Sequence, residues 1–571
     1  MKKINLCARQ RMIALVSALS FSLFSFSTIQ AQEQRIGKHY FETFGGIEAI
    51  VNLEDFDPKV LSDDVVLDHG CSGEDIHLYA TEVGYQELLV SGMEYKLQIR
   101  KNTSVKVKSV EEILKLKSSG ECLPVMDFYP TYTAYVEMMQ EFQNQYPDIC
   151  EIMDIGTLSS GRKILVAHIG DDLDQDDDEP DFLYTSTMHG DEIAGFPLML
   201  QLIDHLLCNY DNSEQIRNLV DNIDIYINPI SNPDGTYRDD DETIQNPTRR
   251  NANNVDLNRN YPDPDDGDQP DNRPRQEEAQ IFMDFADSID FDISANFHGG
   301  AEVVNYPWDT FERFPADVDW WVENLREYAD TAQIFSPDGY MEFLDNGITN
   351  GFAWFEVRGG RQDYMNYFQR CREFTVELSN RKVLSADQLP IVWEANRRSL
   401  LTYMEASLHG LRGVITDCIT GEPVVAEVVI PLHDQDNSSV FSQADLGNFH
   451  RYLDDGSYEV EVRADGYETA TQTVVIVDGE TTILELAICK SSTSTQDEEA
   501  AVWSFEQSET EVLISGPISS EMTVSLYDMS GRTIKIVRGN SRLSTLELQT
   551  GNYIFEIEDR NNRLVKTIFI K

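Results

Sequence analysis

Hydrophobic residues follow two alternating periods along the middle of the chain. Short apolar, β-branched runs predict strands over Ile164–Ile169, Phe182–Thr187, Ile223–Ile230 and Ile293–Phe297. Between them, helical spacing predicts helices over Gly195–Asn209 and Glu214–Asp221, the second opened by Ser213 as an N-cap. This alternation predicts an α/β domain over residues 125–410, a mixed sheet with helices on both faces. Such sheets place functional residues at the carboxyl ends of strands.

The flanking regions carry strand patterns only. Residues 32–124 contain β-type runs such as Glu87–Val90 and Tyr95–Ile99, which predict a strand-rich domain. Residues 411–489 predict a small β-sandwich with strands over Gly413–Thr416, Ala426–Ile430, Tyr458–Arg463 and Thr471–Val477. Residues 490–501 have a linker composition, and 502–571 predict a last all-β domain. We therefore expect small all-β domains on both sides of the α/β domain.

The first residues have the three-part pattern of a secretory signal peptide. Four basic residues lie within the first eleven positions, and Met12–Phe26 is apolar apart from a few serines. This run is too short to span a bilayer. The small residue Ala31 ends the segment, so we predict that residues 1–31 are removed on export. No later stretch predicts a transmembrane segment.

The charge balance excludes some partners. The 571 residues include 100 Asp and Glu against 45 Lys and Arg, a formal net charge of −55. This excess argues against nucleic-acid binding and against docking on anionic lipid, which both depend on clustered basic residues. The acidic runs over residues 171–179 and 263–268 offer carboxylates to Ca²⁺, but neither fits the EF-hand pattern, and solvated loops are the favoured interpretation.

Cysteine spacing suggests disulfides, which export permits. We expect Cys71–Cys122 and Cys418–Cys489, because each pair would close one predicted domain, although sequence alone does not decide the pairing. The chain contains no CxxC motif, which argues against a cysteine metal site.

Chemistry concentrates at the predicted strand ends of the α/β domain. His189 and Glu192 follow the strand over Phe182–Thr187, and His298 follows that over Ile293–Phe297. Imidazole and carboxylate groups suit zinc, and a catalytic zinc has three protein ligands and one open position. The HxxE pair alone is weak, but a third ligand, His298 at another strand end, strengthens it.

Two further features fit a hydrolase. Glu377 lies within an otherwise apolar strand, where an acid needs a partner or a function, so it is a candidate general base. The segment Arg249–Asp263 carries three arginines and five asparagines in an acidic protein. Guanidinium groups bind carboxylates bidentately, so this segment is a candidate site for a substrate carboxylate and a developing oxyanion.

The motifs occur in a recognisable order. They are His189-x-x-Glu192, Asn232-Pro-Asp-Gly235, Arg249-x-Asn251, Asp256-Leu-Asn-Arg259-Asn260, His298-Gly-Gly300, Gly359-Gly-x-Gln-Asp-Tyr364 and Thr375-Val-Glu377-Leu-Ser379. In this order they resemble the zinc metallocarboxypeptidases of the funnelin family, nearest the regulatory subfamily typified by carboxypeptidases N, E, M and D. The resemblance covers about half the chain.

The resemblance implies a role for each motif residue. His189, Glu192 and His298 would hold one Zn²⁺. Glu377 would deprotonate the zinc-bound water and pass the proton to the leaving amine. Arg249, rather than Arg250, would stabilise the oxyanion. The substrate's C-terminal carboxylate would be bound by Asn258 and Arg259, so that one C-terminal residue is removed.

The same resemblance bears on specificity. In that subfamily the positions of Asp309 and Gln362 line the pocket for the departing side chain, and a carboxylate there would pair with Lys or Arg. The expected substrates are therefore peptide or protein C-termini that end in a basic residue. One departure is Phe355, where the family usually has a mobile tyrosine, so we expect slower or altered binding rather than an inactive site.

The flanking domains resemble modules of exported proteins. Residues 411–489 resemble the transthyretin-like sandwich that follows the catalytic domain in the same subfamily. Residues 502–571 resemble the C-terminal sorting domain of type IX secretion, which implies the type IX machinery as a partner and release or surface attachment in a Bacteroidetes-type bacterium. Whether residues 32–124 form an inhibitory propeptide stays open.

Two alternatives to the leading interpretation also stay open. One is a peptidase for cell-wall peptide stems, and the other is a non-catalytic peptide-binding surface protein. The complete ligand set and Glu377 argue against the second.

Overall fold

The computed structural model describes residues 36–52, 56, 64–72, 75–99, 105–116, 122–173 and 177–491, and the strands between 504 and 570. The predicted signal peptide lies outside the described residues, as does nearly all of the predicted linker. The chain divides into two compact units, residues 1–490 and 491–571. The N-terminal domain (32–124), the central domain (125–410) and the sandwich domain (411–489) belong to the first unit.

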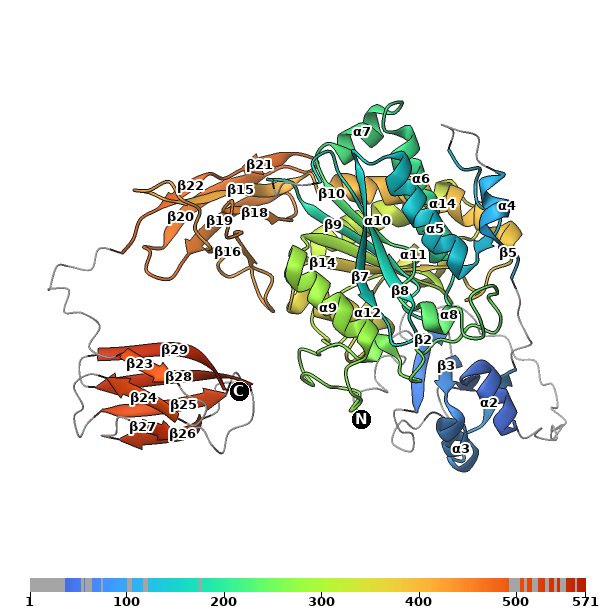
Figure 1. The fold of residues 1–571 in the computed structure, drawn as a ribbon, viewed down its shortest axis with the longest axis horizontal. Helices are drawn as coiled ribbons and strands as arrows, with labels where there is room; N and C mark the ends of the chain where they lie inside the picture. The colour runs from blue at the N-terminus through green and yellow to red at the C-terminus, as the bar shows by residue number, and fades with distance from the viewer. Residues whose placement is uncertain are drawn as a thin grey trace, which may run out of the picture. The chain divides into compact units, whose positions relative to one another are not determined.

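The central domain is built on an eight-stranded mixed sheet of order β13-β12-β14-β11-β9-β10-β8-β7 (Figure 1). The strands are β7 (Cys150–Thr157), β8 (Lys163–Ile169), β9 (Asp181–Ser186), β10 (Asp224–Asn228), β11 (Ile293–His298), β12 (Glu302–Tyr306), β13 (Ile348–Asn350) and β14 (Arg372–Leu378). The four strands β10, β9, β11 and β14 are parallel neighbours. Their carboxyl ends therefore meet at one edge of the sheet.

Helices cover both faces of this sheet, as predicted. The larger core lies under α5 (Tyr132–Gln145), α6 (Gly195–Asn209), α7 (Glu214–Val220), α10 (Val318–Ile334) and α14 (Leu389–Ala406). The opposite face packs against α9 (Glu277–Ile289) and α13 (Arg361–Tyr367). The Ser213 side chain caps α7 by accepting a hydrogen bond from Ile216 N, which confirms the predicted start of this helix.

Shorter elements connect the main ones. They are β6 (Tyr129–Pro130), α8 (Pro233–Thr236), η2 (Leu257–Arg259), α11 (Phe343–Gly347), α12 (Gly351–Trp354) and η3 (Ala386–Gln388). The segment that enters the central domain runs along α6, because Leu123 N donates to Asp204 and Met126 N donates to Gln201.

This segment also corrects a predicted disulfide. Cys122 is bonded to Cys208 at the end of α6, with the two Cα atoms 5.4 Å apart, and not to Cys71. The expectation assumed that a pair would close within one domain, whereas the bond joins the end of the 32–124 region to α6 of the central domain. The second predicted disulfide, Cys418–Cys489, is present.

The N-terminal domain is an antiparallel sheet of order β2-β3-β1-β4 with two main helices. Its elements are α2 (Lys38–Phe44), β1 (Ile47–Asn52), β2 (Val65–Ser72), β3 (Asp75–Ala80), α3 (Glu82–Val90), β4 (Tyr95–Gln98), β5 (Val107–Lys108) and α4 (Val110–Leu114). The prediction of a strand at Glu87–Val90 was wrong. The Thr81 side chain caps the start of α3 by accepting a hydrogen bond from Gly84 N. The negative charge of Glu82, in the first turn, stabilises the helix N-terminus.

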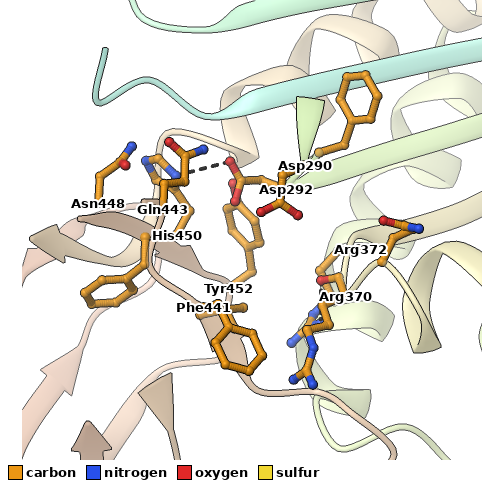
Figure 2. Close-up of a pocket in the computed structure, with 13 residues that line it drawn as sticks. Asp290, Asp292, Arg370, Arg372, Phe441, Gln443, Asn448, His450 and Tyr452 are labelled. Carbon is orange, nitrogen blue, oxygen red and sulfur yellow. Dashed lines mark hydrogen bonds and ion pairs between the residues drawn. The ribbon is translucent and has the colours of Figure 1, made fainter. Parts of the chain in front are cut away.

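The sandwich domain consists of two small sheets. One contains β18 (Asn448–Arg451), β15 (Gly410–Asp417), β21 (Thr481–Ile483) and β22 (Leu486–Ile488); the other contains β17 (Val440–Phe441), β16 (Glu427–Val429), β19 (Gly456–Arg463) and β20 (Ala470–Ile476). Buried charges fix this domain to the central domain, because Asp317 accepts hydrogen bonds from both Arg372 and Arg451. A cavity of about 60 Å³ lies between the two domains (Figure 2).

The C-terminal unit forms two β-sheets. Its strands are β23 (Ser504–Gln507), β24 (Glu511–Ser515), β25 (Thr523–Asp528), β26 (Thr533–Arg538), β27 (Arg542–Ser544), β28 (Gly551–Asp559) and β29 (Asn562–Ile570). In the part of the chain that the structure describes, no helix combines the length and apolar character needed to cross a membrane.

Candidate zinc site and substrate site

Three predicted metal ligands converge at the carboxyl edge of the sheet. His189 and Glu192 lie in the connection from β9 to α6, and His298 is the last residue of β11. Glu192 Oε2 lies 2.9 Å from His189 Nδ1 and 2.8 Å from His298 Nδ1, and the two Nδ1 atoms are 3.1 Å apart. All three side chains are buried.

The donor set fits a zinc ion. His189 Nε2 contacts Asp256 Oδ1 at 3.0 Å, so a proton on Nε2 would leave the Nδ1 lone pair facing Glu192 and His298. Lone pairs that face each other in a buried site repel unless a proton or a metal cation lies between them, and this spacing suits a metal. Tetrahedral ligands at zinc bond lengths lie about 3.3 Å from each other, close to the observed spacing. Burial lowers the pKa of His298 to about 4, which keeps its imidazole neutral and able to bind metal.

Positive groups surround the two buried carboxylates. Arg249 donates from Nη1 to Glu192 Oε1 and from Nε to Asp256 Oδ2, both at 3.0 Å. Lys382 Nζ lies 3.6 Å from Glu192 Oε1. Burial alone would raise the pKa of Glu192, but His189 and His298 hold it well below its ordinary value. Asp256 behaves likewise, since Arg249 and His189 outweigh burial and lower its pKa.

Glu377 lies beside the third ligand. Strands β11 and β14 are parallel, and their register pairs His298 directly with Glu377. Paired residues on neighbouring strands point to the same face of a sheet. The carboxylate of Glu377 is therefore held next to the ligand set by backbone pairing.

The two residues expected to bind a substrate carboxylate lie in and beside η2. Asn258 Oδ1 accepts from Arg361 N at 2.9 Å, and Asn258 N donates to Asp256 Oδ1. The Arg259 guanidinium donates to the carbonyl oxygen of Asn258 at 2.7 Å and to that of Leu67, in the N-terminal domain, at 3.3 Å. Arg250 turns away from the ligand set, donates to Asn254 O and lies over the Tyr79 ring.

Asp309 lies at the centre of a buried polar group. Asn305 Nδ2 and Gln362 Nε2 both donate to its Oδ1 atom, at 3.0 and 3.1 Å. The amide oxygens of Asn305 and Gln362 are buried and have no hydrogen-bond partner among the described residues. Burial, together with the nearby charge of Asp363, raises the pKa of Asp309 well above its ordinary value, although Arg259 opposes the shift.

Phe355 lies in an apolar cluster and not among the predicted metal ligands. It packs against Ala301, Val303 and Trp354 in a small apolar cluster. The structure thus brings together the predicted metal ligands and Glu377, and the predicted pair Asp309 and Gln362, while no described contact joins Phe355 to the ligand set.

Sequence reasoning assigned no role to Asp256 or Lys382. Asp256 was visible in the Asp-Leu-Asn-Arg motif, where its place two residues before Asn258 was a usable signal. Lys382 carried no signal, because it reaches Glu192 from the loop after β14 through tertiary folding.

Three segments of the chain match known protein families. Residues 135–399 match the zinc carboxypeptidase family, 410–488 a carboxypeptidase regulatory-like domain, and 508–571 a secretion system C-terminal sorting domain. The chain belongs to the zinc carboxypeptidase family.

Carboxypeptidases from mammals are among the proteins similar to this chain. The chain is 31% identical to mouse carboxypeptidase M over 377 residues, 61% of this chain and 82% of that protein. It is 30% identical to the rat carboxypeptidase N catalytic chain over 408 residues, 65% of this chain and 88% of that one. Mouse carboxypeptidase D is 32% identical over 403 residues, 67% of this chain, but the match spans only 28% of the relative's length.

A solved structure shows the same fold. Carboxypeptidase A from Helicoverpa armigera superposes with a TM-score of 0.50 at 18% identity, covering 64% of this chain and 98% of that one.

Proposed function

We propose that the protein is an exported zinc-dependent carboxypeptidase that removes single residues from peptide C-termini, with a preference for Lys and Arg. The observation that carries the proposal is the convergence of His189, Glu192 and His298 beside Glu377, with arginines at the substrate side.

Zinc, held by His189, Glu192 and His298, would supply a Lewis acid that polarises the scissile carbonyl and lowers the pKa of water. Glu377, next to His298 in register, takes the proton from the attacking water and returns it to the leaving amine. Arg249, fixed between Glu192 and Asp256, presents positive charge to the developing oxyanion.

The substrate's C-terminal carboxylate is bound by Arg259 and Asn258. The Arg259 guanidinium donates to the backbone carbonyl oxygens of Asn258 and Leu67, and its planar fork of N–H groups suits an incoming carboxylate. An anion bound here places the last peptide bond at the metal ligands and limits the cut to one residue.

The preference for basic residues is supported by Asp309 and its two amide neighbours. The side-chain amides of Asn305 and Gln362 each donate an N–H to Asp309. The carbonyl oxygen of each amide is buried and can be satisfied only by a hydrogen-bond donor. An ammonium or guanidinium group supplies several donors and a charge that pairs with the carboxylate. A neutral aliphatic side chain would satisfy none of these acceptors.

The test is digestion of a peptide panel by the zinc-loaded protein, with and without a chelator, read by mass spectrometry. We expect loss of single C-terminal Lys or Arg, abolished by chelation and restored by zinc. A muropeptide panel run in parallel addresses the cell-wall alternative. Absence of any cleavage by zinc-loaded protein would favour a non-catalytic peptide binder.

The N-terminal domain is proposed to restrain this activity. It approaches the substrate side through Leu67 O, which accepts the Arg259 hydrogen bond that a substrate carboxylate needs. Arg238 fastens α2 by donating to Thr43 O at 2.5 Å, and Arg273 lies 3.6 Å from Asp64. A domain docked in this position competes with the substrate.

Loosening the docked domain tests this restraint. The double variant Arg238→Ala/Arg273→Ala leaves the residues assigned to catalysis intact, and we expect it to hydrolyse basic peptides several-fold faster than the wild type. Arg397→Ala, on α14, is the matched control. Limited proteolysis reports whether the domain has loosened; a loosened domain with an unchanged hydrolysis rate contradicts the restraint.

Export is proposed to use both ends of the chain. Residues 1–31 would direct the protein across the inner membrane, and residues 502–571, which include the sorting-domain match, would direct it through the type IX machinery of a Bacteroidetes-type bacterium. Release or surface attachment follows, and deletion of 502–571 should retain the enzyme in the periplasm.

A further inference from the structure

A second group of potential metal ligands lies at the opposite edge of the central sheet. Asp177 and Glu179 precede β9, and Asp224 begins the adjacent parallel strand β10. One carboxylate oxygen from each lies within 4.8 Å of the others. This is the amino edge of the strands, whereas the zinc ligands follow their carboxyl ends.

Negative charge in this group is poorly compensated. The charges that act on Glu179 are those of Asp177, Asp224, Asp171 and Asp221, all acidic, and burial with this repulsion raises its pKa to about 8. Asp224 Oδ1 contacts His168 Nε2 at 2.6 Å. Among the described residues, no Lys or Arg forms an ion pair with Asp177, Glu179 or Asp224.

A buried side chain from the sandwich domain contacts the loop that carries Asp177. Asn448, on β18, is only 1% exposed, and its Nδ2 atom donates to the Asp177 carbonyl oxygen at 3.4 Å. Its Oδ1 atom is buried and finds no hydrogen-bond partner within the described residues. Figure 2 shows Asn448 at the edge of the cavity between the two domains, beside His450. A buried carbonyl oxygen without a partner is unfavourable, so a ligand for it is favoured.

We propose that Asp177, Glu179 and Asp224, with the Asn448 side-chain oxygen, bind one Ca²⁺ ion. Calcium takes six to eight oxygen ligands at 2.3–2.6 Å, which allows two ligand oxygens to lie up to about 5 Å apart. The oxygen-only donor set suits a hard cation rather than a second zinc. Asp224 can serve through its second oxygen while the first contacts His168.

An ion at this position would hold two domains together. It would join the loop before β9, in the central domain, to β18 of the sandwich domain. The sequence favoured a solvated loop for residues 171–179, and the added ligands come from two distant segments that the sequence could not bring together.

Calcium binding to the full-length, zinc-loaded protein tests the proposal. After dialysis against calcium-free buffer, calcium titration followed by metal analysis should give one Ca²⁺ per chain and raise the thermal midpoint by several degrees. The double variant Asp177→Asn/Glu179→Gln should lose at least about tenfold in calcium affinity and most of the thermal shift. Asp265→Asn/Asp266→Asn, in the other acidic run, is the matched control and should bind calcium like the wild type.

A separate measurement guards against simple misfolding of the variant. Without calcium, Asp177→Asn/Glu179→Gln should be at least as heat-stable as the wild type, because it removes like-charge repulsion. Asn448→Ala should weaken calcium binding several-fold. No calcium bound by the wild type at millimolar concentration, or equal affinity in the double variant, overturns the proposal.

Discussion

The carboxylates at the two edges of the central sheet, buried at the carboxyl edge and half-buried at the amino edge, are balanced in opposite ways. At the carboxyl edge, Glu192 and Asp256 are paired with Arg249 and histidines, and the pKa of each lies well below its ordinary value. At the amino edge, Glu179 is surrounded by other acids and its pKa rises to about 8. Burial opposes ionisation at both edges, so the partners decide the outcome.

Asp309 is an intermediate case that clarifies the contrast. Its neighbours are amides and a further acid, Asp363, with Arg259 too weak to offset burial. The protein thus favours the ionised forms of Glu192 and Asp256 at the proposed zinc site, whereas it disfavours the ionised form of Asp309, which an arriving cation would stabilise. The proposed zinc site and the proposed pocket for the substrate side chain therefore differ in their charge balance.

The largest expected effect comes from the base at the carboxyl edge. Glu377→Gln keeps the shape of the side chain but cannot accept a proton, so kcat should fall by up to about 10⁴-fold. Peptide hydrolysis rates and zinc content should be measured together. Full activity in this variant would mean that another group is the base, and loss of zinc would mean that the substitution acts through the metal site.

Asp309→Asn should remove the charge that selects basic side chains. Loss of one partner of a buried ion pair costs several kcal/mol, so kcat/KM for peptides ending in Lys or Arg should fall about 10²-fold or more. Peptides ending in Leu or Phe are the internal control and should change little. An equal loss for both classes would assign Asp309 to the fold instead.

Asp256→Asn should weaken zinc binding. It removes the acceptor that orients His189 and a partner of Arg249, and loss of such a supporting group lowers metal affinity by about 10- to 100-fold. Competition with a fluorescent chelator measures this directly. Unchanged zinc affinity would contradict the role inferred from the 3.0 Å contact.

The raised pKa of Asp309 predicts a pH-dependent KM. Below that pKa the carboxyl is protonated, and a bound cation requires the ionised form, so KM for basic peptides should fall as pH rises, by at most about tenfold per unit. The fall should continue at pH values where an ordinary aspartate is already ionised. Peptides with neutral C-terminal residues separate this effect from the titration of other groups, and parallel profiles would refute it.

Phe355→Tyr should have the smallest effect. The added hydroxyl offers one hydrogen bond, worth about 1 kcal/mol, so kcat or KM should improve by less than about tenfold. Because Phe355 packs with Trp354 and Val303, away from the charged groups, this variant also tests whether the ring can reach the substrate. No gain in either constant would show that the hydroxyl has no role here.

The local sequence pattern was sufficient to predict many of the helices and strands. Strands such as β8 and helices such as α6 depend on hydrophobic periodicity, and the start of α7 depends on its Ser213 cap; both are properties of neighbouring residues. The convergence of His189, Glu192, His298 and Glu377 could be predicted because motifs at strand ends are short and the α/β fold brings those ends together. Where local signals were misread, as at α3, the Thr81 cap held the missing information.

Other features were decided only by tertiary structure. The Cys122–Cys208 bond, the approach of Leu67 to Arg259 and that of Asn448 to Asp177 each join segments far apart in the chain. Hydrophobic periodicity determines which face of an element is buried, but not which distant element covers it. The sequence therefore determined most of the elements and the proposed zinc ligands and base, whereas tertiary packing decided which charges were balanced and which domain lies beside the proposed substrate side.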